Sequence, residues 1–246
     1  MKIIIAPAKK MTVDSDSLPI LSQPTYLDAT RQILQALRQL TYDEAKALWH
    51  CSDKLARPNY DWLQQLDVTR QLSPAVLAYT GIQYQYMAPD VFTQPAIDYV
   101  QHSLRILSGF YGILRPFDGI VPYRLEMQSK LPVVDQPNLY DFWGSRLYDD
   151  LYEDHEPVIN LASKEYAKAI EKYLRPQDQL ITITFGTLQD GRLKTRATLA
   201  KMARGEMVRF MAEKQVTTVA ALKQFDHLDY RYAAELSTAD QLVFVK

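Results

Sequence analysis

The sequence predicts an α/β protein of the mixed α+β kind, in which helices flank a mixed sheet. Three observations indicate this class. The chain begins with the β-branched run Ile3-Ile4-Ile5, a strand followed by a capped helix spans residues 157–174, and an Asp-Gly hairpin turn lies at positions 190–191. The 246 residues fit one large domain, and the sequence has no internal repeat and no Gly/Ser linker. We therefore expect residues 1–246 to form a single domain.

The N-terminal part predicts one strand and then helices. Residues Lys2–Ala6 do not alternate between polar and apolar residues, which is typical of a strand covered on both faces, and Pro7 ends the run. Apolar residues recur at helical spacing over Tyr26–Leu40. Thr41 and Glu44 match the capping box, in which each side chain accepts a hydrogen bond from the other residue's backbone N–H. A second helix is therefore expected to begin there.

The next part of the chain predicts a short helix, a strand and an ambiguous segment. Ser52 can cap a third helix, and Pro58 should keep it short because proline lacks an N–H and clashes with the preceding turn. Val76–Tyr79 is predicted to be a strand. Apolar spacing predicts a helix over Pro95–Leu107, although Leu104–Leu107 fits a strand equally well.

A strand and two helices are expected in the third quarter. One apolar stripe predicts a helix over Asn138–Tyr152. Pro157–Leu161 is predicted to be a strand, and Ser163 to cap a helix over Lys164–Leu174. A strand followed directly by a helix is typical of a crossover unit in a parallel sheet.

The C-terminal part contains the strongest local signal. Leu180–Leu188 and Arg192–Thr195 flank Asp190-Gly191, a pair that favours a hairpin because both residues tolerate positive φ. A helix is predicted over Thr198–Lys214, and a last strand over Leu242–Val245.

Composition and charge exclude several classes of protein. Lys and Arg total 28 against 29 Asp and Glu, so any nucleic-acid binding must depend on a local basic patch. The single cysteine, Cys51, excludes internal disulfides and favours a reducing, cytoplasmic location. It is better interpreted as a buried hydrophobic residue than as a redox sensor, because it has no resolving partner. No apolar stretch is long enough to span a membrane, so we expect a soluble protein and no membrane partner.

The sequence supports neither a metal site, nor a cofactor, nor a catalytic nucleophile. The four histidines, His50, His102, His155 and His227, have no i, i+4 pairing. There is no Gly-x-Ser-x-Gly motif, and Cys51 has only the adjacent His50 beside it. We therefore expect no metal and no cofactor.

Two basic segments are candidates for anion binding. Gly109 and Gly112 permit a tight turn whose backbone N–H groups could meet an anionic oxygen, with Arg105, Arg115 and Arg124 nearby. Between positions 192 and 214 there are seven basic residues and two acidic ones, and Lys201, Arg204 and Arg209 approach one helical face. The alternatives are a purely structural turn and a solvated basic face. Tyr123–Glu126 and Tyr140–Gly144 combine aromatic, charged and turn residues and are candidate cleft walls.

Seven motifs, in order along the full chain, resemble the YaaA family of peroxide stress proteins. They lie at residues 6–9, 52–56, 102–116, 122–127, 139–144, 159–166 and 203–210. The resemblance implies a cytoplasmic bacterial protein that helps cells to survive hydrogen peroxide by limiting unincorporated iron and thereby DNA damage. It also implies an unusual fold with a basic cleft and a helix-hairpin-helix-like element that binds duplex and distorted DNA. Gly109–Gly112 is the expected place of that hairpin, although its spacing differs from Gly-x-Gly.

Two hypotheses of different classes follow. In the first, a monomeric protein grips DNA phosphates without reading bases, so that its affinity falls steeply with salt. The candidate DNA-binding residues are Lys9, Lys54, Arg105, Gly109, Gly112, Arg115, Arg124, Lys164, Lys201, Arg204 and Arg209. In the second, the protein is an enzyme for a small anionic or nucleotide substrate, with Glu126, Asp141 or Glu165 as acid or base. A closed pocket would favour the second hypothesis. Direct iron binding is a weaker third possibility, because the chain lacks clustered His and Cys.

Overall fold

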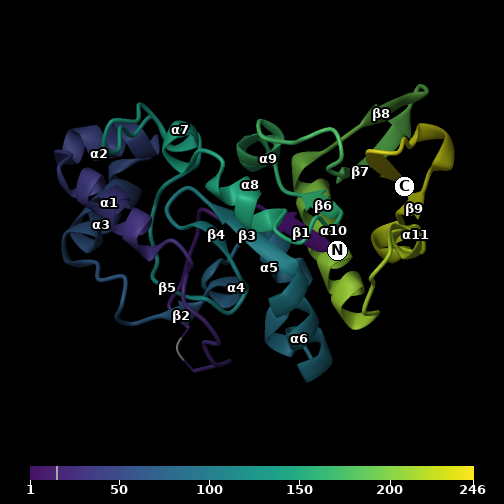
Figure 1. Cartoon of the computed structure of the whole chain (residues 1–246), viewed down its shortest axis with the longest axis horizontal. Coiled ribbons are helices and arrows are strands. Elements are labelled where there is room, and N and C mark those ends of the chain that lie inside the picture. Colours follow the sequence, from purple (N-terminus) through teal and green to yellow (C-terminus); the bar gives the residue numbers. More distant parts are fainter. Residues whose placement is uncertain (15) are drawn as a thin grey trace.

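The computed structural model describes residues 1–14 and 16–246, and a mixed sheet crosses its centre (Figure 1). Within these residues the sheet contains β1 (Lys2–Ile5), β3 (Leu104–Ser108), β4 (Gly112–Leu114), β6 (Val158–Leu161), β7 (Leu180–Gln189), β8 (Arg192–Lys194), β9 (Arg231–Tyr232) and β10 (Gln241–Val245). The order is β4-β3-β1-β6-β7-β10-β9, with β8 beside β7. The strands from β3 to β10 in this order are parallel, whereas β4, β8 and β9 are antiparallel to their neighbours.

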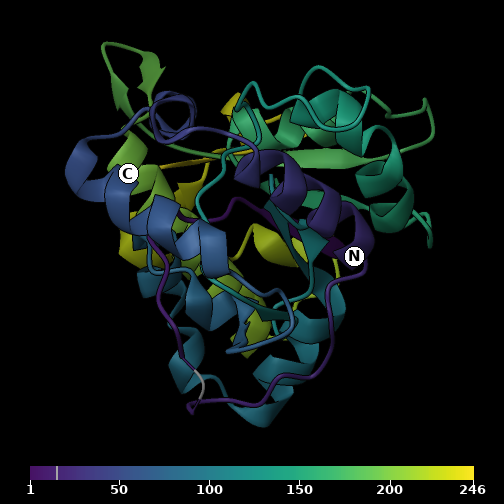
Figure 2. The ribbon, with the colours of Figure 1, turned by 90° about the vertical axis from the view of Figure 1, so that its left-hand side faces the viewer.

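Helices flank this sheet, which confirms the predicted α/β class with a mixed sheet. They are α1 (Leu27–Arg38), α2 (Tyr42–Trp49), α3 (Asp53–Gln65), α4 (Ala75–Ala78), α5 (Ile82–Met87), α6 (Gln94–Ser103), α7 (Leu139–Trp143), α8 (Arg146–Leu151), α9 (Lys164–Glu171), α10 (Ala197–Glu213) and α11 (Val219–Leu222). The part of the chain that the structure describes also has the short 3-10 turns η1 (Pro89–Val91), η2 (His227–Asp229) and η3 (Ala234–Leu236), and β2 (Ser73–Pro74) pairs with β5 (Gly119–Ile120). Helices α1 to α3 gather at one end, on the left in Figure 1 and toward the viewer in Figure 2.

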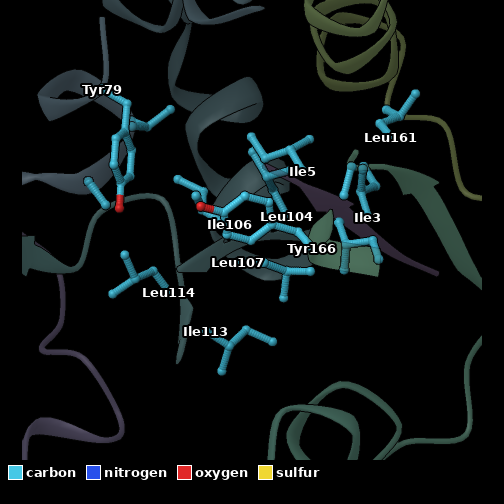
Figure 3. Close-up of a cluster of buried hydrophobic side chains, with 14 of the residues drawn as sticks. Ile3, Ile5, Tyr79, Leu104, Ile106, Leu107, Ile113, Leu114, Leu161 and Tyr166 are labelled. Carbon is cyan, nitrogen blue, oxygen red and sulfur yellow. The ribbon is translucent and has the colours of Figure 1, made fainter. Parts of the chain in front are cut away.

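The core is centred on the parallel strands. Ile3, Ile4 and Ile5 of β1 are fully buried between β3 and β6, as the absence of polar alternation predicts. Figure 3 shows the side chains of β1, β3 and β6 in one cluster that includes Ile106 and Leu161. Burying an isoleucine side chain of this kind contributes about 1.5–3 kcal/mol.

Most predicted elements are confirmed within one to three residues. These are the strands at 2–6, 157–161 and 242–245, the helices at 26–40, 164–174 and 198–214, and the hairpin around 190–191. The capping box is present, since Thr41 Oγ1 accepts from Glu44 N at 3.3 Å and Glu44 Oε2 accepts from Thr41 N at 2.8 Å. Asp190 and Gly191 both have positive φ, 53° and 72°, as the hairpin requires.

Two predictions in the α-rich part are wrong. Val76–Tyr79 is not a strand, because Ala75–Ala78 forms the single buried turn α4; a short apolar run does not distinguish a strand from a buried helix. Pro58 does not shorten the third helix, since α3 spans 13 residues and continues past Pro58 to Gln65. Pro58 lies on the exposed face, where the carbonyl that it leaves unpaired can bind water, and the Asn59 side chain donates to the carbonyl of Leu55 at 2.7 Å.

Two further helices differ from their predicted extents, one because of strand pairing and the other because of a glycine. The helix predicted over Pro95–Leu107 ends at Ser103, because Leu104–Ser108 pairs with β1 as strand β3. The helix predicted over Asn138–Tyr152 is divided at Gly144, whose φ is 55°. Ser163 precedes α9 but makes no side-chain capping bond.

The glycine pair at 109 and 112 lies in the turn between β3 and β4, so this segment does not join two helices. Gly112 has φ 79° and packs against Trp143 and Leu147, and the carbonyl of Gly109 accepts a hydrogen bond from Trp143 Nε1 at 3.0 Å. Both glycines are buried. Their expected placement in a helix-hairpin-helix-like element with exposed N–H groups is therefore incorrect.

Candidate functional site

A cavity of about 500 Å³ opens at the carboxyl ends of two central strands. Residues 6–10, which follow β1, form one wall, and residues 163–166, which follow β6, contribute Ser163, Glu165 and Tyr166 to another. The chain leaves β1 toward β3 on one side and leaves β6 toward β7 on the other. Ligands of open α/β sheets bind in the crevice where the connections diverge in this way. The cavity lies at that position.

A close contact between two helices builds the opposite wall. Gln83 and Tyr84 of α5, and Lys201 and Arg204 of α10, line the cavity. Gly205 allows the helices to meet, since a Cβ at this position would overlap the carbonyl oxygen of Gln83. The segment at 123–126 and the end of α2 complete the lining.

Cations outnumber acids around the cavity. The lining contains five cations, Lys9, Lys10, Arg124, Lys201 and Arg204, and two carboxylates, Glu126 and Glu165. Lys9 pairs with Glu126. Among the residues that the structure describes, the other four cations have no carboxylate within 4.0 Å. The lining therefore carries more positive than negative formal charge.

Unpaired hydrogen-bond donors are concentrated in the same walls. In residues 1–14 and 16–246, five buried side-chain nitrogen or oxygen atoms lack a partner, and four belong to this lining: Trp49 Nε1, Gln83 Nε2, Arg124 Nε and Arg204 Nε. An unmet buried donor costs about 1–3 kcal/mol. Burial also lowers the pKa of Arg204, with no acidic partner to offset the loss of hydration. All four atoms are donors, so a ligand rich in acceptors matches these walls.

Glu165 is the lining carboxyl group with the most perturbed surroundings. Burial, and then the neighbouring Glu126, raise its pKa, while the backbone N–H of Gln128 donates to Oε1 at 3.2 Å and lowers it. The net shift is upward, which brings the carboxyl group closer to the range in which an acid–base catalyst works.

Tyrosine rings form much of the interior. Tyr84 donates its hydroxyl to the carbonyl of Ala6 at 3.0 Å. The Tyr123 hydroxyl lies 2.7 Å from Ser108 Oγ and 2.8 Å from the Tyr79 hydroxyl, and burial raises the pKa of Tyr123 to about 12. Because these hydroxyls are already bonded within the protein, both residues offer ring surface to the cavity.

The structure brings together part of the predicted site. Lys9, Arg124, Lys201 and Arg204 line the cavity with Glu126 and Glu165, and Tyr123–Glu126 is one of its walls. The remaining candidates, which are not in the lining, are Lys54, Arg105, Gly109, Gly112, Arg115, Asp141, Lys164 and Arg209. Lys54, Arg115 and Lys164 are exposed elsewhere on the surface.

Three of those outlying residues have partners of their own. Arg105 is buried and donates to the carbonyls of His102 and Leu104, with Asp150 4.0 Å away. Arg209 pairs with Glu213 at 2.7 Å, and Asp141 with Lys172 at 3.3 Å. These three side chains are therefore engaged within the protein and not directed to the cavity.

Sequence reasoning missed several lining residues. Lys10 is adjacent to Lys9 and could have been included, and Tyr166 ends the motif at 159–166, whereas Trp49, Gln83 and Tyr84 lie in none of the seven motifs. Across the described ranges, no group of three or more His, Cys, Asp or Glu side chains is placed to hold a metal ion. None of the described helices is both long and apolar enough to cross a bilayer.

Comparisons with known proteins identify the family. The family model described as "Peroxide stress protein YaaA" matches residues 1–236. A "UPF0246 protein" of Lactiplantibacillus plantarum is 64% identical over 245 residues, which cover 100% of this chain and 99% of the relative. Its counterparts in Pediococcus pentosaceus and Lachnoclostridium phytofermentans are 58% and 48% identical over 246 residues, covering 100% of this chain and 98% and 96% of theirs. The resemblance found in the seven motifs is thus confirmed, and the chain belongs to the YaaA family of peroxide stress proteins.

Proposed function

We propose that this peroxide stress protein binds double-stranded or distorted DNA through the cations around its cavity. One observation carries the proposal: Lys10, Arg124, Lys201 and Arg204 surround one opening and have no carboxylate within 4.0 Å in the described parts of the chain. Phosphate oxygens would supply both the negative charge and the acceptors that these side chains lack. Lys9 joins them when its ion pair with Glu126 opens to a phosphate.

The proposal extends to the cellular role that the family resemblance implies. DNA binding in the cytoplasm would accompany a limit on unincorporated iron, and so on hydroxyl-radical damage to DNA. Lys54, Arg115 and Lys164 are exposed outside the cavity and can lengthen the phosphate contact if the duplex lies across more than its mouth.

Salt dependence provides the first test. Fluorescence anisotropy with intact, bulged and junction DNA at about 50 and about 200 mM salt should show a steep loss of affinity at the higher salt, by a factor that grows with each phosphate that the protein binds. Tighter binding to distorted DNA is expected. If the protein does not bind any of these DNAs at low salt, the proposal is wrong.

Single cation variants test which surface is used. Arg204→Ala and Arg115→Ala are both expected to weaken duplex binding and to reduce the slope of log affinity against log salt by about one each, because each variant no longer neutralises one phosphate. Arg70→Ala is the matched control, because Arg70 is exposed and outside the cavity. Unchanged affinity in both test variants would remove the assignment of these residues to a DNA-binding surface.

A second function is favoured by a separate observation. The site is a cavity of limited volume at the point where the strand connections diverge, and it contains Glu165, whose pKa is raised by burial. This arrangement suits an enzyme that acts on a small anionic or nucleotide substrate, with Glu165 or Glu126 as acid or base. Saturable binding of a small anion with a weak salt dependence, together with turnover that Glu165→Gln abolishes, would support this function over DNA binding.

A further inference from the structure

The cavity is too small for a duplex but large enough for one nucleotide. A volume of about 500 Å³ corresponds to a sphere about 10 Å across, whereas the major groove of B-DNA alone is about 12 Å wide. Cavities of about 300–1,000 Å³ typically hold small ligands. A nucleic acid bound at the mouth can therefore use the interior only by presenting a single nucleotide to it.

The lining changes from charged at the rim to aromatic inside. The charged part consists of exposed and half-buried cations, whereas Tyr84 and Tyr123 are buried and offer ring surface. The exposed cations are Lys9, Lys10 and Lys201, and the half-buried ones are Arg124 and Arg204. Phosphates favour the first environment, and the faces of nucleobases favour the second, since every base can stack on an aromatic ring. The two halves of a nucleotide match the two parts of the cavity.

Two inner residues add hydrogen-bonding groups. Trp49 and Gln83 are each only 7% exposed, and Trp49 Nε1 and Gln83 Nε2 have no partner. The edges of nucleobases present acceptors to such donors, and a glutamine amide offers a donor and an acceptor together. A ligand that carries only a phosphate would leave these groups unmet.

We propose that the cavity binds one nucleotide, with its phosphate held by Arg124 and Arg204 and its base among the aromatic side chains, where Gln83 and Trp49 contact the base edge. The proposal rests on the proposed function and deepens it, because it assigns the interior to a nucleotide and not to the backbone of an intact duplex. The nucleotide is either free in solution or unpaired within distorted DNA, and the chemistry that recognises it is the same.

Two arms of one experiment distinguish these sources. In the first, the full chain is titrated into a duplex with a single bulged 2-aminopurine and into the same duplex with that base paired. Because 2-aminopurine fluorescence depends on stacking, the bulged probe should change its signal and the paired probe should not. In the second, calorimetry compares adenosine monophosphate with inorganic phosphate, and the nucleotide should bind more tightly by about tenfold or more, owing to its additional hydrogen bonds and stacking.

Variants connect the signal to the cavity. Gln83→Leu should lower the affinity for the bulged probe or the nucleotide by about tenfold, with little effect on binding of an intact duplex. Lys201 is exposed, so Lys201→Gln should leave folding unaffected and should weaken binding of both the bulged probe and the intact duplex. Arg70→Gln, the control, should change the affinity for neither DNA. Melting temperatures verify that each variant is folded.

The outcomes separate the two proposals. DNA binding with an unchanged 2-aminopurine signal and no nucleotide binding would overturn the nucleotide site and leave the proposed function standing. Nucleotide binding without DNA binding would support the site and contradict the proposed function. A bulged-probe signal that Gln83→Leu and Lys201→Gln do not alter would place the base outside this cavity and overturn the proposal.

Discussion

Gly205 of α10 lies against the carbonyl group of Gln83 in α5 with no room between them for a side chain. Its neighbour in sequence, Arg204, and Gln83 itself both line the cavity. The packing of these two helices therefore sets the position of a cation and of an unpaired amide in the same wall. Gly205, which lies in the motif at 203–210, thus influences the site through helix packing.

Gly205→Ala should destabilise the protein and displace the α5 wall. The added methyl group would overlap Gln83 O and approach Met87 N to 2.9 Å, and both are backbone atoms that cannot move independently. Overpacking of this kind costs about 1–3 kcal/mol. Urea unfolding would measure the decrease in stability, with Thr198→Ala on the exposed part of the same helix as the control. Equal stability of Gly205→Ala and the control would show that the helices separate freely.

Local signals in the sequence predicted the elements that depend on neighbouring residues. The Thr41–Glu44 capping box and the Asp190-Gly191 turn were found because their partners lie within a few positions in the chain. Leu104–Leu107 fits a helix and a strand equally well in the sequence, because the pairing of this segment with β1 joins residues about 100 positions apart. The strand predicted over Val76–Tyr79 is wrong for a related reason, because a segment buried on all sides lacks the hydrophobic periodicity that distinguishes a helix from a strand.

For the site too, the sequence indicates single residues, whereas only the fold shows which of them lie together. Lys9, Arg124 and Arg204 were predicted as cations in motifs, but only the fold shows that these three, and not Arg105, meet at one opening. Gln83 carried no sequence signal, because its significance comes from a helix contact and from an unpaired donor. The prediction that the glycines at 109 and 112 bind a phosphate is wrong, because their tight turn packs against Trp143 instead. The sequence does not distinguish a turn that packs in this way from one that binds a phosphate.

Replacing Arg204 by methionine should separate stability from binding. Arg204 is half-buried, and its buried Nε has no partner, so this group loses hydration and gains no hydrogen bond in return. Arg204→Met should therefore leave the unliganded protein as stable or more stable by about 1–3 kcal/mol. The same variant should bind DNA or a nucleotide at least about tenfold more weakly. Chemical unfolding and anisotropy on the same samples would test both effects. Marked destabilisation without weaker binding would mean that Arg204 is a structural residue.

The pH dependence of stability should report the carboxyl group of Glu165. Its folded-state pKa is raised above 4.5, mainly by burial, so the folded state holds the proton more tightly than the unfolded state does. Stability is therefore lost as the pH rises from about 4.5 through the folded-state pKa. Glu165→Gln removes this loss and keeps an oxygen for the Gln128 N–H, so the variant should be more stable than the wild type at pH 7 and equal to it near pH 4. Glu171→Gln, an exposed change in the same helix, is the control. A stability difference that does not vary with pH would contradict this assignment.

Cys51→Ser should retain peroxide protection. Cys51 is half-buried and free, and the chain has no second cysteine that could resolve a sulfenic acid as a disulfide within the molecule. Its packing against the core is that of a small hydrophobic residue, so the substitution should cost no more than about 1 kcal/mol and leave the cavity unchanged. Survival after hydrogen peroxide would be measured in cells that lack their own copy of the gene and carry the wild type, the variant or an empty vector. Survival at the level of the empty vector, from a variant shown to be folded and equally abundant, would establish a chemical role for the thiol.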